Sequence, residues 1–246
     1  MTEPPGGIFD RHYIAIEGVI GVGKTTLARL LQPVFAAELL LEVFEENPFL
    51  SNFYADRARY AFQTQIFFLL SRYHQQREAA PSALARGALI ADYTFAKDAL
   101  FARLNLGGDE LATYQRVHEA LAEKIPPPNL TVYLRADTDV LMRRIASRDR
   151  PYERAMERSY IDQLRGAYDE YYLAEGAAQR RGDAAERPGA AAATVGDAAL
   201  RPSVTIDTND LDFVGNADHL ARVTDRVRAA LGIGAYQAAL PLMTHD

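Results

Sequence analysis

Short apolar runs of strand length alternate along the chain with longer stretches in which apolar residues recur at helical spacing. The predicted strands are residues 13–17, 39–44, 88–92, 130–134 and 204–207. The predicted helices are residues 24–35, 60–80, 109–124, 137–147, 159–174 and 216–231. This alternation predicts an α/β fold, with a parallel sheet of about five strands and helices on both of its faces.

One segment, residues 174–203, shows neither period. About half of its residues are Ala or Gly and charged residues are scattered through it, so little of it can be buried against a core. We predict a loop inserted into a single domain that spans residues 1–246. The alternative is a short alanine-rich helix.

Composition narrows the classes of protein. The chain has no cysteine, which excludes disulfides, thiolate metal sites and cysteine nucleophiles. Its 33 acidic residues against 27 Lys and Arg argue against a broad contact with nucleic acid. No export leader is evident, and no apolar run reaches the roughly 18 residues of a membrane span. We therefore expect a cytoplasmic protein whose partners include neither membrane nor nucleic acid.

Residues 18–25 read Gly-Val-Ile-Gly-Val-Gly-Lys-Thr, which fits the phosphate-loop pattern G-x-x-x-x-G-K-[ST] between a strand and a helix. Glycines let the backbone N–H groups of such a loop turn towards phosphate oxygens. The expected nucleotide-binding residues are Gly18, Gly21, Val22, Gly23, Lys24, Thr25 and Thr26. Lys24 would reach the β- and γ-phosphates of ATP, and the Thr25 hydroxyl would ligate Mg²⁺. Switches, motors and small-molecule kinases share this loop, and a glycine-rich turn that binds nothing is the alternative.

Two acidic residues follow predicted strands and are candidates for chemistry. Glu42 lies late in the second strand, where a buried carboxylate could accept a proton from a hydroxyl group. Asp92 ends the third strand, where a second contact to Mg²⁺ is expected. The alternatives are a Glu that faces water on an edge strand and an Asp that shapes a turn.

Six arginines lie between residues 143 and 158. Arg144 and Arg148 share a helical face and Arg150 directly precedes Pro151, so three guanidinium groups can point at a polyphosphate. This pattern predicts an arginine-rich lid. Because acidic residues are interspersed, a solvated helix with surface salt bridges is the alternative.

A further candidate is Gln65, a polar residue inside the aromatic helical stretch 60–73. Its carboxamide offers a donor and an acceptor side by side, which suits the edge of a nucleobase. Such a helix is most often simple core packing.

Taken together, segments 13–26, 42–50, 53–72, 92–102, 130–172 and 204–214 resemble the deoxynucleoside kinases, particularly the bacterial deoxyadenosine and deoxyguanosine kinase branch. The resemblance implies the P-loop kinase fold and ATP-dependent phosphorylation of the 5'-hydroxyl of a deoxyribonucleoside, with a purine preferred. It also implies a homodimer.

The resemblance assigns roles to single residues. Glu42 matches the general base, with Val43 in place of the usual proline. The expected substrate-binding residues are Glu42, Tyr54, Gln65, Arg72, Asp98, Phe101 and Asp162, of which Tyr54 and Asp162 would hold the sugar 3'-hydroxyl and Gln65 would read the base. The expected catalytic residues are Glu42, Lys24, Arg72, Arg144, Arg148 and Arg150.

The third-strand motif departs from the mammalian and insect pattern of the family, in which Arg-Ser follows the acid, as bacterial relatives often do. Here Tyr93 follows Asp92, so Arg72 is expected to take more of that catalytic task. Three other functions stay open on the residues alone: a nucleoside monophosphate kinase of the thymidylate kinase type, a non-catalytic nucleotide-binding module, and a kinase with a non-nucleoside acceptor.

Overall fold

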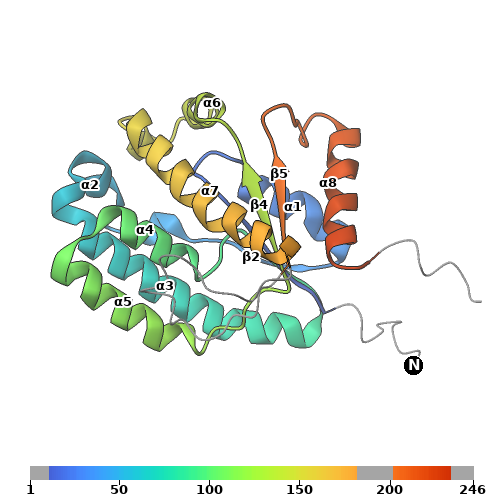
Figure 1. Ribbon diagram of the computed structural model, residues 1–246, viewed down its shortest axis with the longest axis horizontal. Helices are drawn as coiled ribbons and strands as arrows, with labels where there is room; N and C mark the ends of the chain where they lie inside the picture. The colour runs from blue at the N-terminus through green and yellow to red at the C-terminus, as the bar shows by residue number, and fades with distance from the viewer. Residues whose placement is uncertain (1–10, 182–201, 234–246) are drawn as a thin grey trace, which may run out of the picture.

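Five parallel strands form the single sheet of the computed structural model, which describes residues 11–181 and 202–233 (Figure 1). The strands are β1 (Tyr13–Gly18), β2 (Glu38–Leu40), β3 (Leu89–Ala91), β4 (Leu130–Arg135) and β5 (Ser203–Asp207). Their order in the sheet is β2-β3-β1-β4-β5, and every neighbouring pair is parallel. The predicted fold class is therefore confirmed.

The helices between the strands are more numerous than predicted, and α3 and α7 are longer than the predicted stretches 60–80 and 159–174. They are α1 (Lys24–Phe35), α2 (Leu50–Ala55), α3 (Arg57–Arg86), α4 (Lys97–Asn105), α5 (Gly108–Ala122), α6 (Thr138–Arg148), α7 (Arg158–Arg181) and α8 (Ala217–Ala230). Two short 3₁₀ turns, η1 (Phe44–Glu46) and η2 (Pro151–Glu153), follow β2 and α6.

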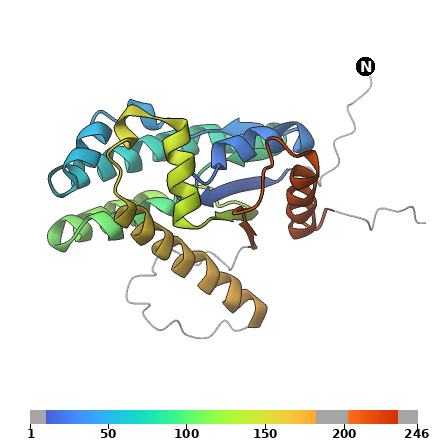
Figure 2. The ribbon, with the colours of Figure 1, turned by 90° about the horizontal axis from the view of Figure 1, so that it is seen from above.

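Helices cover the sheet on both faces. Helix α1 packs on β1, β2 and β3, and Figure 2 shows α1 and α7 on opposite sides of the sheet. The central strands β1 and β4 are consequently buried, with Ile14, Ile16, Val132 and Leu134 fully inaccessible. Helices α3, α4 and α5 pack together beside the sheet, and α7 rests on α4.

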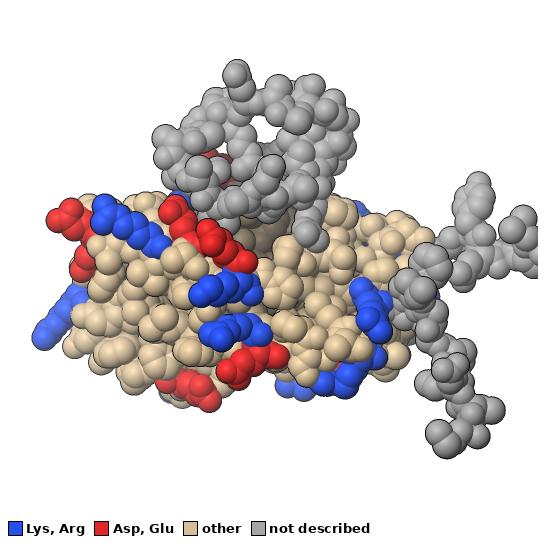
Figure 3. Space-filling model, turned by 90° about the horizontal axis from the view of Figure 1, so that it is seen from below, with Lys and Arg blue, Asp and Glu red and all other residues tan. Residues whose placement is uncertain are grey.

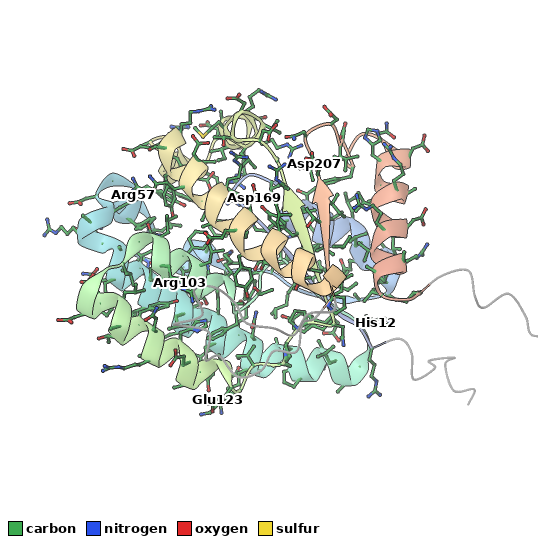
Figure 4. All side chains as sticks on the ribbon, viewed as in Figure 1. His12, Arg57, Arg103, Glu123, Asp169 and Asp207 are labelled. Atoms are coloured by element: carbon green, nitrogen blue, oxygen red, sulfur yellow. The ribbon has the colours of Figure 1, made fainter. Side chains whose placement is uncertain are left out.

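Helix α7 is fastened to β4 by aromatic and polar contacts. The rings of Tyr133 and Tyr172 stack with centroids 4.9 Å apart. The Tyr133 hydroxyl donates to Asp169 over 2.8 Å, and Nε of Arg135 donates to the same carboxylate over 2.9 Å. Figure 4 labels Asp169 on α7 and Asp207 at the end of β5, 3.6 Å from Arg135. These contacts hold α7 against β4.

Strand β2 is shorter than the predicted 39–44 and leaves Glu42 outside the sheet. Its partner β3 has only three residues. Beyond β3, the acceptor for the chain after β2 is the carboxylate of Asp92 instead of a backbone carbonyl oxygen. The N–H of Glu42 donates to Asp92 over 2.8 Å. The chain after β2 is thus positioned by a side chain rather than by a strand partner.

Helix α3 continues past the predicted end at residue 80. Pro81 removes one backbone hydrogen bond, but the following turn buries Ala83, and Arg86 pairs with Glu38 over 2.6 Å. Helices α2 and α4 have no counterpart in the prediction. The six residues of α2 are too few for a helical period, and the buried face of α4 includes the charged residues Lys97 and Asp98.

The predicted loop 174–203 falls largely outside the described residues. Helix α7 extends to Arg181, so the part of this segment before residue 182 is helical rather than a loop. The alanine-rich composition is compatible with this extension because alanine has the best intrinsic helix propensity.

Positive and negative side chains are interspersed over the face shown in Figure 3. Exposed ion pairs are also present, such as Arg154–Asp149 with atoms 2.7 Å apart. Within residues 11–181 and 202–233, no helix combines the length and the apolar character needed to cross a membrane.

Candidate active site

The carboxyl ends of all five strands meet at one edge of the sheet because the strands are parallel. The loop after β1 is the predicted phosphate loop, Asp92 follows β3, and Glu42 comes two residues after β2. Helix α6 lies beyond the same edge, above β4 and β5 (Figure 1). The sequence-predicted residues of the loop, the base, the metal site and the lid therefore converge on one side of the molecule.

Two glycines of the phosphate loop are required by its geometry. Gly18 has φ +145° and a Cβ there would come within 2.4 Å of the Leu134 carbonyl oxygen. Gly21 has φ +86° and its Cβ would come within 2.8 Å of Ile145 on α6. Helix α1 then begins at Lys24 with no side-chain cap, so its first N–H groups stay open to an anion.

Lys24 is held inside this loop by backbone carbonyls. Its Nζ donates to Gly18 O over 2.7 Å and to Val19 O over 3.3 Å. Burial, together with the positive charge of Lys97, lowers the pKa of Lys24 to about 8. An incoming polyphosphate would offset both effects and restore the full positive charge.

Thr25 and Asp92, the predicted metal ligands, are directly hydrogen-bonded to each other. Their hydroxyl and carboxylate oxygens are hard donors of the kind Mg²⁺ prefers, and Mg²⁺ commonly uses one or two protein ligands and completes its shell with phosphate and water. The donor set fits that ion. No cluster of three or more acidic, His or Cys side chains forms a ready-made metal cage in the described part of the chain.

Glu42 lies between two cations. Arg72 Nε donates to its carboxylate over 3.0 Å, and Lys97 Nζ donates to the other oxygen over 2.7 Å. Burial alone raises the pKa of Glu42, but the charges of Arg72 and Lys97 outweigh it and hold the pKa far below the ordinary value. The carboxylate is therefore ionised at neutral pH and is not the water-facing Glu of the alternative interpretation.

Arg72 joins Glu42 to the proposed base-reading residues. It forms a second ion pair with Asp98, which is fully buried at the start of α4. Gln65, one of the few fully buried amides, lies seven residues before Arg72 and thus on the same face of α3. The structure therefore brings Arg72 and Asp98 together and places Gln65 two turns away. Phe101 lies one turn after Lys97 on α4, with the Lys97 ammonium 5.7 Å from the centre of its ring.

Tyr54 faces the lid turn η2. Its ring stacks on Tyr152 with an angle of 12° between the planes. Burial raises the pKa of Tyr54 well above its ordinary value, and the nearby charge of Glu153 adds to this effect. Glu153 itself is buried, with 4% of its side chain exposed, and accepts two hydrogen bonds from Arg148, of 2.7 and 2.6 Å.

The three lid arginines have partners within the protein. Arg144 bonds the Thr208 carbonyl oxygen after β5 over 2.7 Å. Arg150 stacks its guanidinium 4.0 Å from the centre of the Phe44 ring and lies 3.7 Å from Glu153, which is also the partner of Arg148. The phosphate loop, Arg144, Arg148 and residues 209–214 line an open cavity of about 590 Å³, which has the size of a nucleotide site. Two of the three lid arginines therefore line this cavity, and their role at a polyphosphate stays a prediction.

Asp162 was the prediction that the geometry does not support. Its carboxylate is half exposed, accepts a hydrogen bond from Thr138 on α6 and lies 3.9 Å from Arg158. No described contact joins it to Tyr54 or Glu42. The buried acid beside Tyr54 is Glu153, one of the interspersed acids that the alternative to the lid prediction placed on a solvated helix.

The sequence analysis also did not identify Lys97 as a residue of the site. The signal available in the sequence was its rarity, since the chain holds only three lysines, at positions 24, 97 and 124. The residues 209–214 beside the phosphate loop gave a signal only through the family resemblance of segment 204–214, because loop polarity alone does not indicate a ligand.

A phosphate loop at the switch point of a parallel sheet, a strand-end acid and an arginine lid define a P-loop kinase. The family model described as deoxynucleoside kinase matches residues 14–231. The chain therefore belongs to the deoxynucleoside kinase family, and it is an enzyme of the kinase class.

Individual relatives agree with this assignment. A deoxyguanosine kinase of Bacillus subtilis is 39% identical over 158 residues, covering 64% of this chain and 76% of the relative. A deoxyadenosine kinase of Dictyostelium discoideum is 35% identical over 186 residues, covering 70% and 75%. The solved deoxyadenosine kinase from M. mycoides with bound dATP superposes with a TM-score of 0.68 over 88% of this chain and 99% of the other, at 23% identity, and so supports the fold.

Proposed function

We propose that this enzyme transfers the γ-phosphoryl group of ATP to the 5'-hydroxyl of a purine deoxyribonucleoside. The observation that carries the proposal is the ionised carboxylate of Glu42, held by Arg72 and Lys97 at the same sheet edge as Lys24. A kinase whose acceptor is an alcohol needs a base next to its phosphate loop. The purine preference follows from the relatives, which are named deoxyguanosine and deoxyadenosine kinases.

The proposed mechanism uses few groups. Glu42 orients the 5'-hydroxyl and takes its proton as the oxygen bonds to the γ-phosphorus and the bond to the ADP oxygen breaks. Lys24 and the lid arginines Arg144, Arg148 and Arg150 stabilise the charge on the equatorial oxygens. The pKa of Glu42 lies far below its ordinary value, so the carboxylate is ionised at neutral pH and can accept a hydrogen bond from the acceptor hydroxyl.

Mg²⁺ would be held by Thr25 and Asp92 together with phosphate oxygens. When bound, it would neutralise charge on the β- and γ-phosphates. Thr25 would take that ligand role in place of its hydrogen bond to Asp92, while the other oxygen of Asp92 accepts from the Glu42 N–H.

Recognition of the sugar and base falls to the side of the site formed by α2, α3 and α4. Tyr54 and the buried Glu153 would hold the 3'-hydroxyl, and packing against this edge of the sugar would disfavour a 2'-hydroxyl. Gln65, Arg72 and Asp98 would supply donors and acceptors for a purine edge, and Phe101 would supply an apolar surface from the middle of α4.

The decisive experiment incubates purified protein with Mg²⁺ and ATP, or GTP, and a panel of deoxynucleosides, ribonucleosides and nucleoside monophosphates. The expected product is a purine deoxynucleoside 5'-monophosphate. If only monophosphates react, the enzyme is a nucleoside monophosphate kinase instead. If ATP binds and no acceptor on the panel reacts, the nucleoside kinase proposal fails.

A homodimer that acts in the cytoplasm stays a prediction from the family resemblance. Sedimentation or light scattering of the purified protein at micromolar concentration tests the dimer directly. A particle of twice the 27.3 kDa chain mass is expected.

A further inference from the structure

Lys97 carries an ammonium group that is buried at the centre of the site. It is the first residue of α4, and 5% of its side chain is exposed. Its Nζ donates to Glu42 over 2.7 Å, which leaves two further N–H donors on the same nitrogen. Burying a cation costs free energy unless the charge has a partner, so this position needs an explanation beyond core packing.

Arg72, the other cation on Glu42, also pairs with a second carboxylate. Arg72 contacts the carboxylates of both Glu42 and Asp98, and its guanidinium lies 4.6 Å from the centre of the Phe68 ring. It therefore has two acidic partners on the nucleoside side of the site. This disagrees with the expectation that Arg72 takes over the role of a cation next to the third-strand acid.

Tyr93, which occupies the position after Asp92, cannot supply that cation. Its side chain is buried and its hydroxyl donates to Gln75 over 2.6 Å. The loop after Asp92 instead leads into α4, where the Thr94 hydroxyl accepts a hydrogen bond from the Lys97 N–H over 3.3 Å. This turn directs Lys97 back towards the end of β2 and Glu42.

Lys97 also lies close to the phosphate loop. Its charge is the second-largest cause, after burial, of the lowered pKa of Lys24. Glu17, which directly precedes the phosphate loop, accepts hydrogen bonds from Thr94 N over 2.6 Å and Thr94 Oγ1 over 2.8 Å, so the turn before Lys97 is fixed beside that loop. A phosphoryl group that enters from the loop towards Glu42 would meet both cations.

We propose that Lys97 is a catalytic residue, whose ammonium binds an oxygen of the transferring phosphoryl group while it fixes Glu42 beside the acceptor hydroxyl. This inference rests on the proposed kinase function. In the step, the acceptor oxygen bonds to phosphorus, the bond to the ADP oxygen breaks and the hydroxyl proton goes to Glu42. Lys97 remains protonated throughout and stabilises charge on the equatorial oxygens.

The test replaces Lys97 with Met, Gln and Arg and compares the steady-state constants with those of the unaltered enzyme, using Mg²⁺-ATP and the best acceptor of the panel. We expect K97M to lower kcat by roughly a hundredfold or more, as for other donors to a developing anion. The KM for the nucleoside should change by less than about threefold, because Tyr54, Gln65 and Arg72 remain in place. The kcat of K97R should be at least about tenfold higher than that of K97M, because the charge is restored.

The matched control is Lys124→Met, since Lys124 is an exposed lysine after α5 and far from the site in the fold. Its kcat should stay within about twofold of the unaltered enzyme. K97Q, which keeps a donor to Glu42 without the charge, replaces K97M if circular dichroism shows that K97M is unfolded.

A second measurement separates catalysis from structure. ADP with aluminium fluoride and nucleoside places a planar anion where the phosphoryl group passes. The affinity of K97M and K97Q for this combination should fall in parallel with kcat, while their affinity for ADP alone stays unchanged. A folded K97M or K97Q with undiminished kcat overturns the role of Lys97 and leaves the kinase function intact. If the unaltered enzyme phosphorylates no nucleoside, the proposed function itself has failed.

Discussion

At the scale of single residues, the site is organised by a small number of buried charges that share partners. Glu42 has two cations, Arg72 has two carboxylates, and Asp92 contacts both Thr25 and the backbone of Glu42. Each group depends on a neighbour from another segment of the chain. A change in one charge is therefore expected to alter the protonation or position of another.

The role of Glu42 as general base leads to the first prediction. Glu42→Gln should lower kcat by at least about a hundredfold, because the amide keeps the shape of the side chain and cannot take the proton. Turnover is measured under saturating ATP and nucleoside. Glu46→Gln, a change in an exposed residue of the same segment, is the control and should have little effect. An E42Q enzyme with nearly normal turnover would remove Glu42 from the role of base.

The pKa of Lys24 leads to a pH prediction. Because it is lowered to about 8, Lys24 in the free enzyme loses its charge as the pH rises through that value. ATP affinity should therefore decrease between about pH 7 and about pH 9, over a range in which an ordinary lysine stays charged. Calorimetric titration with ATP measures this affinity at each pH. In Lys24→Arg the charge persists, so a slope equal to that of the unaltered protein would contradict the explanation.

At the scale of elements, the phosphate loop and the lid helix α6 are in direct contact. Gly21 lies against Ile145 and the Leu141 carbonyl oxygen, both on α6. Arg144 on the same helix donates to the Val22 carbonyl oxygen over 3.4 Å. The start of the lid is therefore positioned by the loop that binds the donor.

Gly21→Ala tests this contact. The added methyl group would lie 2.8 Å from Ile145 at a φ of +86°, so either α6 or the loop has to shift. We expect ATP affinity to fall by roughly tenfold or more and the melting temperature to decrease. Gly166→Ala is the matched control, since a Cβ there meets nothing within 4 Å and replacing glycine in a helix should stabilise the protein by about 0.5–1 kcal/mol. Equal ATP affinity in both variants would refute the proposed coupling.

The elements that hydrophobic periodicity could predict were those with an ordinary buried stripe or a continuous apolar run. The central strands β1 and β4 and helix α1 were predicted to within one residue at each end. Helix α4 was not, because its inner face holds Lys97 and Asp98 in the place of apolar residues. The position of Glu42 likewise depends on Asp92, fifty residues away in the chain, and no local pattern reports that contact.

At the scale of the whole molecule, the buried Glu17 joins three regions. Its carboxylate at the end of β1 accepts hydrogen bonds from Thr94 N over 2.6 Å and Thr94 Oγ1 over 2.8 Å. The Tyr168 hydroxyl on α7 also donates to it, over 3.1 Å. Glu17 therefore fixes three parts of the molecule relative to one another: the phosphate loop, the turn before Lys97 and helix α7.

Glu17→Ala should therefore destabilise the protein by about 3 kcal/mol or more, because it leaves the buried groups of Thr94 and Tyr168 without an acceptor. Urea denaturation measures the free energy of unfolding. Glu38→Ala, which removes another strand glutamate, is the control, and it should have a far smaller effect because its pair with Arg86 is exposed to water. Equal losses in the two variants would rule out a special role for Glu17.

Asp92 has a further consequence, which concerns the order and mutual influence of substrate binding. One of its oxygens faces Thr25 in the half of the site that takes the donor, and the other fixes the backbone of Glu42 in the half that takes the acceptor. We therefore expect the substrate that arrives first to alter the geometry that the second one meets. If it does, thermodynamic linkage requires that ATP and nucleoside change each other's affinity by the same factor, and this single carboxylate couples the two halves of the site.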